Sequence, residues 1–211
     1  MIGKKGLFIV FEGITSTGKS THVKQLRDHL KSLGKKVLIN DEPTQGFWGR
    51  VIRAVIENKN SKFSEIERQS IFIRDRADDL RDTIRPVLKK GYIILQDRYE
   101  LSTFAHGLTS GLSFEVLDRL EKELLGKEYL KPDYTIFLDI DPKTSIKRLK
   151  KSKKRIDIYE SLKQTTKIHD NYKKLIKMKK RFGKIIVIDA HGSIDEVYKK
   201  LLRKFKQLGI T

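Results

Sequence analysis

The sequence contains no cysteine, and among its 211 residues it has only four prolines and one tryptophan. The absence of cysteine excludes a disulfide framework and a zinc site with thiolate ligands, and it is typical of the reducing cytoplasm, where we expect this protein. Uninterrupted apolar runs reach only about five residues, far short of the ~20 that a membrane-spanning helix needs. Residues 1–6 carry two lysines with no long apolar stretch behind them, so we expect neither a signal peptide nor a membrane partner.

Acidic residues are also scarce relative to basic ones. The chain has 46 Lys and Arg against 27 Asp and Glu, a formal net charge of +19. The excess is concentrated between Lys143 and Arg181, where sixteen basic residues face three acids. Such a segment could be a solvated helix pair, a clamp on a polyphosphate or a nucleic-acid surface, and charge alone does not separate these interpretations.

The length suits one α/β domain with a substantial core, or two very small ones. No linker rich in Pro, Gly or Ser interrupts the chain, and no internal repeat is present. We therefore predict a single domain over residues 1–211.

The most specific motif is a phosphate-binding loop, which reads G-x-x-x-x-G-K-S over residues 13–20. It follows an apolar run and precedes a helical pattern over 21–33, the context that such a loop requires. Its glycines allow a tight turn with inward N–H groups, and the helix N-terminus adds positive charge. Lys19 is expected to reach the β- and γ-phosphates, and the Ser20 hydroxyl a magnesium ion. The predicted triphosphate-binding residues are Gly13, Ile14, Thr15, Ser16, Thr17, Gly18, Lys19, Ser20 and Thr21.

Five short apolar runs alternate with helical patterns, which predicts a parallel sheet with helices on both faces. The runs are 7–11, 37–39, 92–95, 134–138 and 185–188. Capping boxes are predicted at Ser64 and Ser193, and we expect the helix that begins near Ser64 to stop before Pro86. His22 and His29 are expected on a helix surface.

Ligands of open parallel sheets bind at the carboxyl ends of the strands. The segments to examine are therefore 13–20, 41–50, 97–106, 139–142 and 189–192. One of them begins Asp97-Arg98-Tyr99, and the helical pattern before it places Phe72 and Arg76 on one face. These two could stack a base and hold a phosphate, or Phe72 could be core and the arginines of this helix surface partners of neighbouring aspartates.

The protein class can be narrowed further. The chain lacks the Asn-Lys-x-Asp element of GTPases, which excludes that class. A motor ATPase could use 134–139 as its magnesium-binding strand but usually needs a longer chain. A small kinase needs only a donor loop, an acceptor pocket with arginines and a basic lid, and all three are present in the sequence.

An ordered series of motifs carries a resemblance to one family. The series is Phe8–Gly13, the loop ending Gly18-Lys19-Ser20-Thr21, Glu42-Pro43-Thr44 with Gly49-Arg50, Asp97-Arg98-Tyr99 with Leu101-Ser102-Thr103, Lys131-Pro132-Asp133, Leu138–Pro142 and Arg155-Ile156-Asp157. In this order, from about residue 6 to 200, the sequence resembles the thymidylate kinases. The resemblance implies a five-stranded parallel sheet with a short lid, a homodimer, and transfer of the γ-phosphoryl group of ATP to dTMP with Mg²⁺.

The resemblance also implies roles on the donor side. Lys19 and Ser20 would bind the ATP phosphates and the metal, and Glu12 and Asp97 would lie near the water shell of the metal. Arg148 would flank the adenine.

The lid is expected at about residues 150–160. The phosphate-binding loop has no arginine, and in relatives of that kind a lid arginine supplies the catalytic charge. Arg155 is the only arginine in the string 151–155. The catalytic set implied is Lys19, Asp97, Arg98 and Arg155.

On the acceptor side, Arg98 would contact the phosphate, helped by Arg76 and Arg50, and Phe72 would stack on the base. The acceptor-binding set implied is Thr15, Arg50, Phe72, Arg76, Arg98 and Ser102. The sequence departs from the family at three places. Thr15 replaces an acid that usually holds the sugar 3′-hydroxyl, Asp41 replaces an arginine, and 104–107 reads Phe-Ala-His-Gly where relatives have Ala-Tyr-Gln-Gly.

Two alternatives follow from these departures and from the charge. The same fold could phosphorylate dUMP or UMP, or the chain could be a non-catalytic P-loop protein that binds nucleic acid through residues 143–181. Nucleic acid is not the partner we expect, because the kinase residues occur together.

Overall fold

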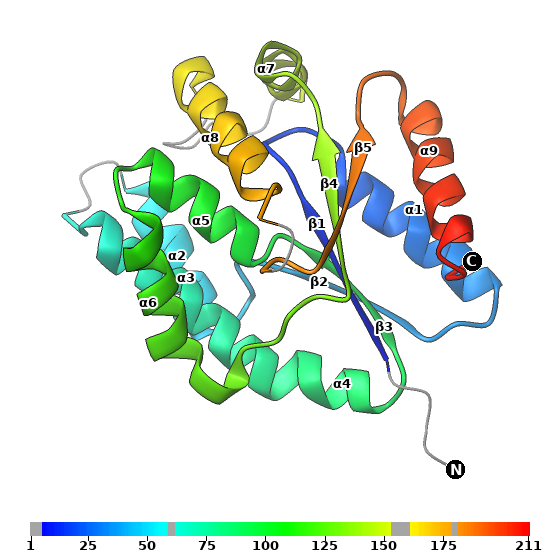
Figure 1. Cartoon of the computed structure of the whole chain (residues 1–211), viewed down its shortest axis with the longest axis horizontal. Helices are drawn as coiled ribbons and strands as arrows, with labels where there is room; N and C mark the ends of the chain where they lie inside the picture. The colour runs from blue at the N-terminus through cyan, green and yellow to red at the C-terminus, as the bar shows by residue number, and fades with distance from the viewer. Residues whose placement is uncertain (1–5, 59–61, 153–160, 179–180) are drawn as a thin grey trace.

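The computed structural model describes residues 6–58, 62–152, 161–178 and 181–211. Its centre is a five-stranded, all-parallel sheet in the order β2-β3-β1-β4-β5 (Figure 1). The strands are β1 Leu7–Glu12, β2 Val37–Asp41, β3 Ile93–Asp97, β4 Tyr134–Asp139 and β5 Lys184–Asp189. The predicted parallel α/β sheet is confirmed, and each strand begins within one residue of its predicted apolar run.

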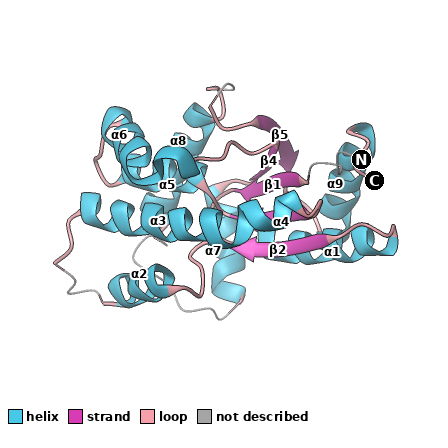
Figure 2. Cartoon of the chain, turned by 90° about the horizontal axis from the view of Figure 1, so that it is seen from below, coloured by secondary structure: helices cyan, strands magenta, loops and turns pink. Residues whose placement is uncertain are grey.

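Helices cover both faces of this sheet, as predicted. They are α1 Lys19–Ser32, α2 Phe47–Glu57, α3 Glu65–Asp79, α4 Arg85–Lys89, α5 Glu100–Thr109, α6 Phe114–Leu125, α7 Pro142–Lys151, α8 Leu162–Leu175 and α9 Ile194–Gln207. One face carries α1 and α9, and the other carries α3, α5, α6 and α8 (Figure 1). On this second side α2 packs against α3 (Figure 2). None of the helices in the described ranges is long and apolar enough to cross a membrane.

The central strand β1 is buried on both sides, which explains its continuous apolar sequence. Phe8 and Val10 pack in one cluster with Ile73 of α3, whereas Ile9 belongs to the cluster that contains Leu26 of α1. Because β1 is fixed from both layers, the loop that follows it has a rigid base.

Both predicted capping boxes are present, at Ser64 and Ser193. The prediction that the first of these helices stops before Pro86 is wrong. After α3 the chain continues through a π-helical turn, Leu80–Ile84, into α4, and Pro86 lies in the first turn of α4. The wider turn changes the hydrogen-bond register, so the missing N–H and the bulk of the proline ring are accommodated. The helix ends instead before Gly91, which has φ 80°.

His22 also differs from expectation, because it is buried rather than exposed. Its ring stacks on Tyr198 of α9 with 6.4 Å between the ring centroids, and Nδ1 lies 3.1 Å from Gln25 Oε1. Burial lowers the pKa of His22. Packing between α1 and α9, which the local pattern does not reveal, decides this position.

A buried carboxyl group joins α3 to the sheet. Asp79 Oδ2 accepts from Asn40 Nδ2 of β2 at 2.5 Å, and the same amide donates to Gln96 of β3 at 2.8 Å. Burial raises the pKa of Asp79 to about 6, and the Asn40 hydrogen bond opposes that shift. An ionised Asp79 therefore costs the folded state free energy that the unfolded chain does not bear.

Asp79→Asn tests this cost. Below the unfolded pKa the carboxyl is protonated in both states. Its destabilising effect grows as pH rises above the unfolded pKa and is complete above the folded pKa of about 6. The variant should therefore gain stability relative to wild type from pH 4 to pH 7, by on the order of 2–3 kcal/mol. Urea unfolding at both pH values measures this. Asp78→Asn, which changes a more exposed carboxylate of α3, is the control; an equal pH response in both variants contradicts the assignment.

Candidate functional site

The loop after β1 has the backbone shape that its glycines predict. Gly13 and Gly18 have φ 144° and 94°, and a Cβ on Gly13 would lie 2.6 Å from the carbonyl oxygen of Leu138. Only glycine fits such a position without displacing backbone. Helix α1 begins at Lys19, whose Nζ donates to the carbonyls of Gly13 and Ile14 at 3.0 Å each. The lysine is therefore held against the loop that it would serve.

Ser20 and Asp97, predicted to lie near a metal, meet at the neighbouring strand end. Ser20 Oγ donates to Asp97 Oδ2 at 2.6 Å. The other carboxylate oxygen, Oδ1, is buried and has no hydrogen-bond partner within the described residues. A hydroxyl and an under-coordinated carboxylate are oxygen ligands that suit Mg²⁺. Within the same residues no cluster of three or more His, Cys, Asp or Glu could hold a metal, so such an ion would need ligands from phosphate and water.

Glu12, at the end of β1, is a fully buried carboxylate. It accepts hydrogen bonds from the backbone N–H groups of Tyr99 and Ser102, at 2.9 and 3.1 Å. The hydroxyls of Ser102 and Tyr172 donate to its other oxygen at 2.7 and 3.0 Å. Burial raises the pKa of Glu12, while these hydrogen bonds and the charge of Arg98 lower it. Its described contacts join β1 to α5 and α8, and its predicted place near the metal's water shell stays a prediction.

Arg98 lies between the loop and the next strand end. Its Nη1 donates to Gly13 O at 3.2 Å and to Ser102 Oγ at 3.1 Å. Its backbone has φ 69°, a left-handed conformation that costs energy for any residue except glycine. Such strain is common at functional sites, where the surrounding structure enforces it.

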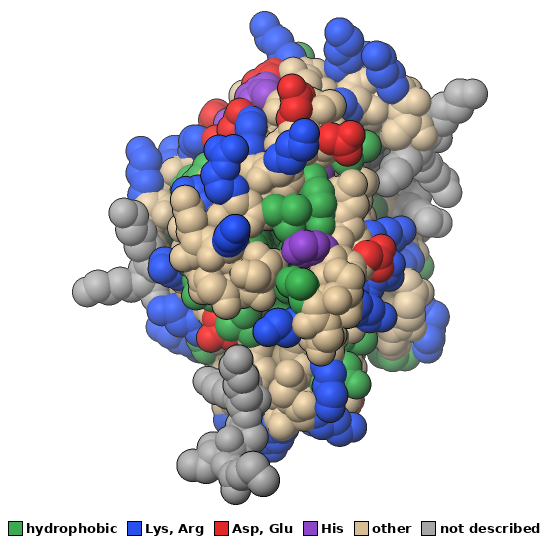
Figure 3. Space-filling model, turned by 90° about the vertical axis from the view of Figure 1, so that its right-hand side faces the viewer, with side chains coloured by type: hydrophobic (Ala, Val, Ile, Leu, Met, Phe, Trp, Pro, Cys, Tyr) green, Lys and Arg blue, Asp and Glu red, His purple; other side chains and the backbone are tan. Residues whose placement is uncertain are grey.

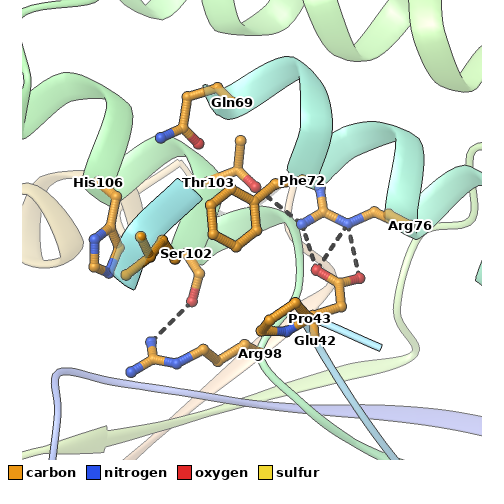
Figure 4. Close-up of a pocket in the computed structure, with 10 residues that line it drawn as sticks. Glu42, Pro43, Gln69, Phe72, Arg76, Arg98, Ser102, Thr103 and His106 are labelled. Atoms are coloured by element: carbon orange, nitrogen blue, oxygen red, sulfur yellow. Dashed lines mark hydrogen bonds and ion pairs between the residues drawn. The ribbon is translucent and has the colours of Figure 1, made fainter. Parts of the chain in front are cut away.

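A pocket opens beside Arg98 (Figure 4). Its walls come from the segment after β2, from α2, α3 and α5, and from the residue after β3. The lining residues are Glu42, Pro43, Ile56, Gln69, Phe72, Arg76, Arg98, Ser102, Thr103 and His106. Four residues of the predicted acceptor set, Phe72, Arg76, Arg98 and Ser102, thus come together. Figure 4 shows Arg98 and Gln69 on opposite sides of the Phe72 ring.

Phe72 has a core contact and also faces the pocket, while its stacking on a base stays a prediction. It packs against the small cluster of Ile52, Val55 and Ile71, and it also lines the pocket. The alternative of surface ion pairs is wrong for Arg76, because that residue is only 1% exposed. It holds for Arg81, whose pairs with Asp78 and Asp82 are exposed.

The guanidinium of Arg76 is surrounded by side chains that bind it. Its guanidinium makes a two-pronged ion pair with Glu42, at 2.7–3.2 Å, and contacts Glu121 at 2.5 Å. It also donates to Thr103 Oγ1 at 2.9 Å and stacks on the Tyr99 ring. Burial raises the pKa of Glu42 to about 7 in spite of the Arg76 charge. Contact between Arg76 and an acceptor phosphate stays a prediction.

Two other predicted acceptor residues lie outside the pocket lining. Arg50 is exposed and donates to the carbonyl of Gln45 at 3.1 Å. Arg53, one helical turn after Arg50, donates to the carbonyls of Pro43 and Thr44, at 2.7 Å each, and holds the segment after β2 in place. The carbonyl of Thr15 accepts from Ser145 of α7 at 2.7 Å. The contacts of Arg50 and Thr15 with an acceptor stay predictions.

The predicted donor-base residue, Arg148 on α7, donates to the carbonyl of Gly192 at 2.9 Å. This contact joins α7 to the segment after β5, so Arg148 lies near the carboxyl edge of the sheet. Its place beside adenine stays a prediction. Arg155 and most of the predicted lid lie outside the described residues.

Several residues of the site were given no role by the sequence analysis. Gln69 and Thr103 line the pocket, and Tyr172 contacts Glu12 and Ser102 from a distant helix. A signal for Gln69 existed, since it lies three residues before Phe72 on the same helical face. No spacing rule could have indicated Tyr172, which is 160 residues from Glu12.

The phosphate-binding loop after a central parallel strand, the Ser20–Asp97 contact and the adjoining arginine-lined pocket define the class of P-loop nucleotide kinases. The comparison with known proteins is more specific. The chain belongs to the thymidylate kinase family, whose model matches residues 11–201.

Among its relatives is the thymidylate kinase of Sulfurihydrogenibium sp. (strain YO3AOP1), 35% identical over 97% of this chain and 99% of that protein. The probable thymidylate kinase of Pyrococcus abyssi is 32% identical over 98% and 100% of the two chains. The thymidylate kinase of Caldicellulosiruptor saccharolyticus is 30% identical over 97% and 98%.

Glu12→Gln tests the carboxylate at this junction. The amide of glutamine has one acceptor oxygen, and its NH₂ group would face N–H and O–H groups that donate to wild-type Glu12. Because these donors would lose their acceptor, the free energy of unfolding should fall by about 1–3 kcal/mol or more. Chemical denaturation measures this. Glu123→Gln, the same substitution at an exposed carboxylate of α6, is the control. Wild-type stability in Glu12→Gln would show that Glu12 is protonated and does not depend on these donors.

Proposed function

We propose that the protein transfers the γ-phosphoryl group of ATP to dTMP, giving dTDP, with Mg²⁺ bound. The observation that carries this proposal is the position of Arg98, which contacts the phosphate-binding loop at Gly13 and also lines the acceptor pocket. One guanidinium thus lies where a donor on the loop and an acceptor in the pocket would meet. Membership of the thymidylate kinase family supports the same pair of substrates.

The chemistry needs no general base. The second pKa of a phosphate monoester is about 6, so the acceptor oxygen is already ionised near neutral pH. Catalysis then depends on alignment and on cations near the transferring group. In this chain Lys19 and Arg98 both contact the carbonyl of Gly13 in the phosphate-binding loop, and we assign a third cation to Arg155 in the lid.

Ser20 and Asp97 would hold the metal, directly or through water. When bound, Mg²⁺ neutralises charge on the donor phosphates. Asp97 Oδ1 has no hydrogen-bond partner in the part of the chain that the structure describes, which supports this assignment.

The acceptor would lie with its base against Phe72 and its phosphate toward Arg98. The ring offers a face for stacking, and Arg98 lies on the loop side of the pocket. His106 takes a place in the pocket lining and so bears on the choice among dTMP, dUMP and UMP. Burial and the charges of Arg98 and Lys19 lower the pKa of His106 to about 3, so it would meet the acceptor as a neutral ring.

The nucleic-acid alternative is less favoured because part of the basic segment 143–181 is already engaged inside the protein. Lys173 pairs with Asp139 at 2.6 Å, Arg148 with the carbonyl of Gly192, and Arg181 with Glu100 at 2.7 Å. Figure 3 presents the side of α9, away from α8, and there too Lys and Arg side chains are scattered rather than gathered in one stripe. A salt titration with single-stranded DNA tests the alternative, since phosphate contacts give a log–log slope near −0.7 each.

We further propose that residues 1–211 act as one domain, that two chains form a homodimer, and that the enzyme works in the cytoplasm, where ATP and dTMP are found. Family membership supports the dimer. Light scattering coupled to gel filtration measures the mass in solution.

Lys19→Ala, assayed with a panel of monophosphates, tests the proposed reaction. Wild type should show its highest kcat/KM with dTMP and lower values with dUMP and UMP. The variant should lose at least about a hundredfold in kcat, because it removes a charge aimed at the transferring group. Lys24→Ala, on the exposed face of the same helix, should leave kcat unchanged. Absence of ADP formation with every acceptor, or normal turnover in Lys19→Ala, would refute the proposal.

Arg155→Ala tests the lid assignment. It should lower kcat by roughly 10³-fold while leaving the Kd for ATP within about threefold, because a lid arginine acts on charge in the transition state. Lys153→Ala and Lys154→Ala are the matched controls. If one of these lowers kcat while Arg155→Ala does not, the catalytic cation is that lysine.

A further inference from the structure

Behind the acceptor pocket, buried charges continue away from Arg76. Glu121 of α6 is 1% exposed, and its two oxygens contact two different arginines. Oε1 meets Arg76 at 2.5 Å, and Oε2 lies 3.4 Å from Nη2 of Arg181. Arg181 precedes β5 and does not line the pocket. Glu121 therefore links a pocket residue to an arginine outside the pocket.

Arg181 binds two further carboxylates. Its Nη2 lies 2.7 Å from Glu100 Oε1, and its Nη1 donates to Asp118. The guanidinium also lies 4.9 Å from the centre of the Phe104 ring. These contacts fix the group between α5 and α6, with 22% of its side chain exposed.

The charges of this cluster are not balanced. Two arginines and Lys122, which pairs with Asp118 at 2.6 Å, face four carboxylates, Glu42, Glu100, Asp118 and Glu121. Burial, and then the charge of Glu100, raise the pKa of Glu121 well above its ordinary value, and the arginines oppose this. Removing one partner of a buried ion pair leaves an uncompensated charge that its neighbours must move to meet. Without Arg181, the described ion pairs leave Glu121 with Arg76 and leave Glu100 with no cation.

Two routes lead from Arg181 to the pocket. The first passes through Glu121 to Arg76, which holds Glu42 and Thr103 in the pocket wall. The second passes through Glu100, the first residue of α5, the helix that carries Ser102, Thr103 and His106 into the pocket. The described side-chain hydrogen bonds of Arg76 and Arg181 go to Glu42 and to residues of α5 and α6, and none goes to the phosphate-binding loop.

We propose that Arg181 is a positioning residue for the acceptor site: it neutralises Glu100 and Glu121 and so keeps Arg76 bound to Glu42 and Thr103 in the pocket wall. The proposal rests on the proposed phosphorylation of dTMP. We expect its main effect on acceptor binding, because neither Arg76 nor Arg181 makes a described side-chain hydrogen bond to the donor loop.

Arg181→Met removes the charge and retains an unbranched side chain. The KM for dTMP should rise about tenfold or more, because one decade corresponds to the loss of a single charge-assisted contact. The KM for ATP and kcat should stay within about twofold. Arg181→Lys retains the charge without the planar fork and should give an intermediate rise. Arg81→Met, which removes an arginine with exposed ion pairs, should change none of these values.

The double variant Arg181→Met/Glu121→Gln separates positioning from loss of bulk. Glutamine can still accept from Arg76 but no longer carries an uncompensated charge, so the KM for dTMP should return most of the way to wild type. A merely structural role predicts that the two losses add and that the melting temperature falls further. Circular dichroism shows whether each variant is folded. If Arg181→Met does not fold, the KM values of Arg181→Lys are compared with those of wild type instead.

Three results would overturn the proposal: a lowered melting temperature with an unchanged KM for dTMP, an equal rise of both KM values, or no recovery in the double variant. An inactive wild type would count against the proposed function instead. Calorimetric titration of dTMP would then decide the role of Arg181, since the proposal requires weaker dTMP binding by Arg181→Met whatever the turnover. Equal affinities of wild type and variant would refute it.

Discussion

Glu12 ends the central strand with its carboxylate inside the protein, where it accepts four hydrogen bonds from Tyr99 before α5, from Ser102 of α5 and from α8. The strand is fixed by both layers of the fold, so this carboxylate provides a stable point for elements that are remote in sequence. Through Ser102 it also fixes Arg98, and through Arg98 the carbonyl side of the phosphate-binding loop. The relative position of the donor loop and the acceptor pocket therefore depends on hydrogen bonds to one buried anion.

The acceptor wall follows a different physical rule. It is lined by an aromatic ring and several polar groups, and behind it lies a cluster in which buried acids outnumber arginines. Burying charges is costly, and such a cluster persists only while each group keeps its partner. Because the same arginine contacts Glu42, Glu121 and Thr103, the wall has little freedom to adapt to a different acceptor. Rigidity of this kind favours selection by shape and hydrogen bonding.

The sequence predicted those features that depend on local pattern. The strands, the phosphate-binding loop and the capping boxes at Ser64 and Ser193 are encoded by residue type and spacing over a few positions. Phe72 and Arg76 could be paired because one helical turn separates them. The partners of Arg76 could not be found in this way, since Glu121 is 45 residues distant and is brought near by packing of α6 on α3. Pro86 and His22 were wrongly predicted because a π-helical turn and the packing of α9, respectively, override the local rule.

The left-handed backbone of Arg98 matters for any attempt to raise the thermal stability of this protein. Glycine adopts φ 69° without the penalty of about 1 kcal/mol or more that a residue with a Cβ meets there. Arg98→Gly would relieve that strain and at the same time remove the guanidinium that joins the loop to the pocket. Selection for thermal stability alone would thus favour the loss of a residue on which the proposed reaction depends. A screen for thermostable variants therefore has to measure turnover together with the melting temperature.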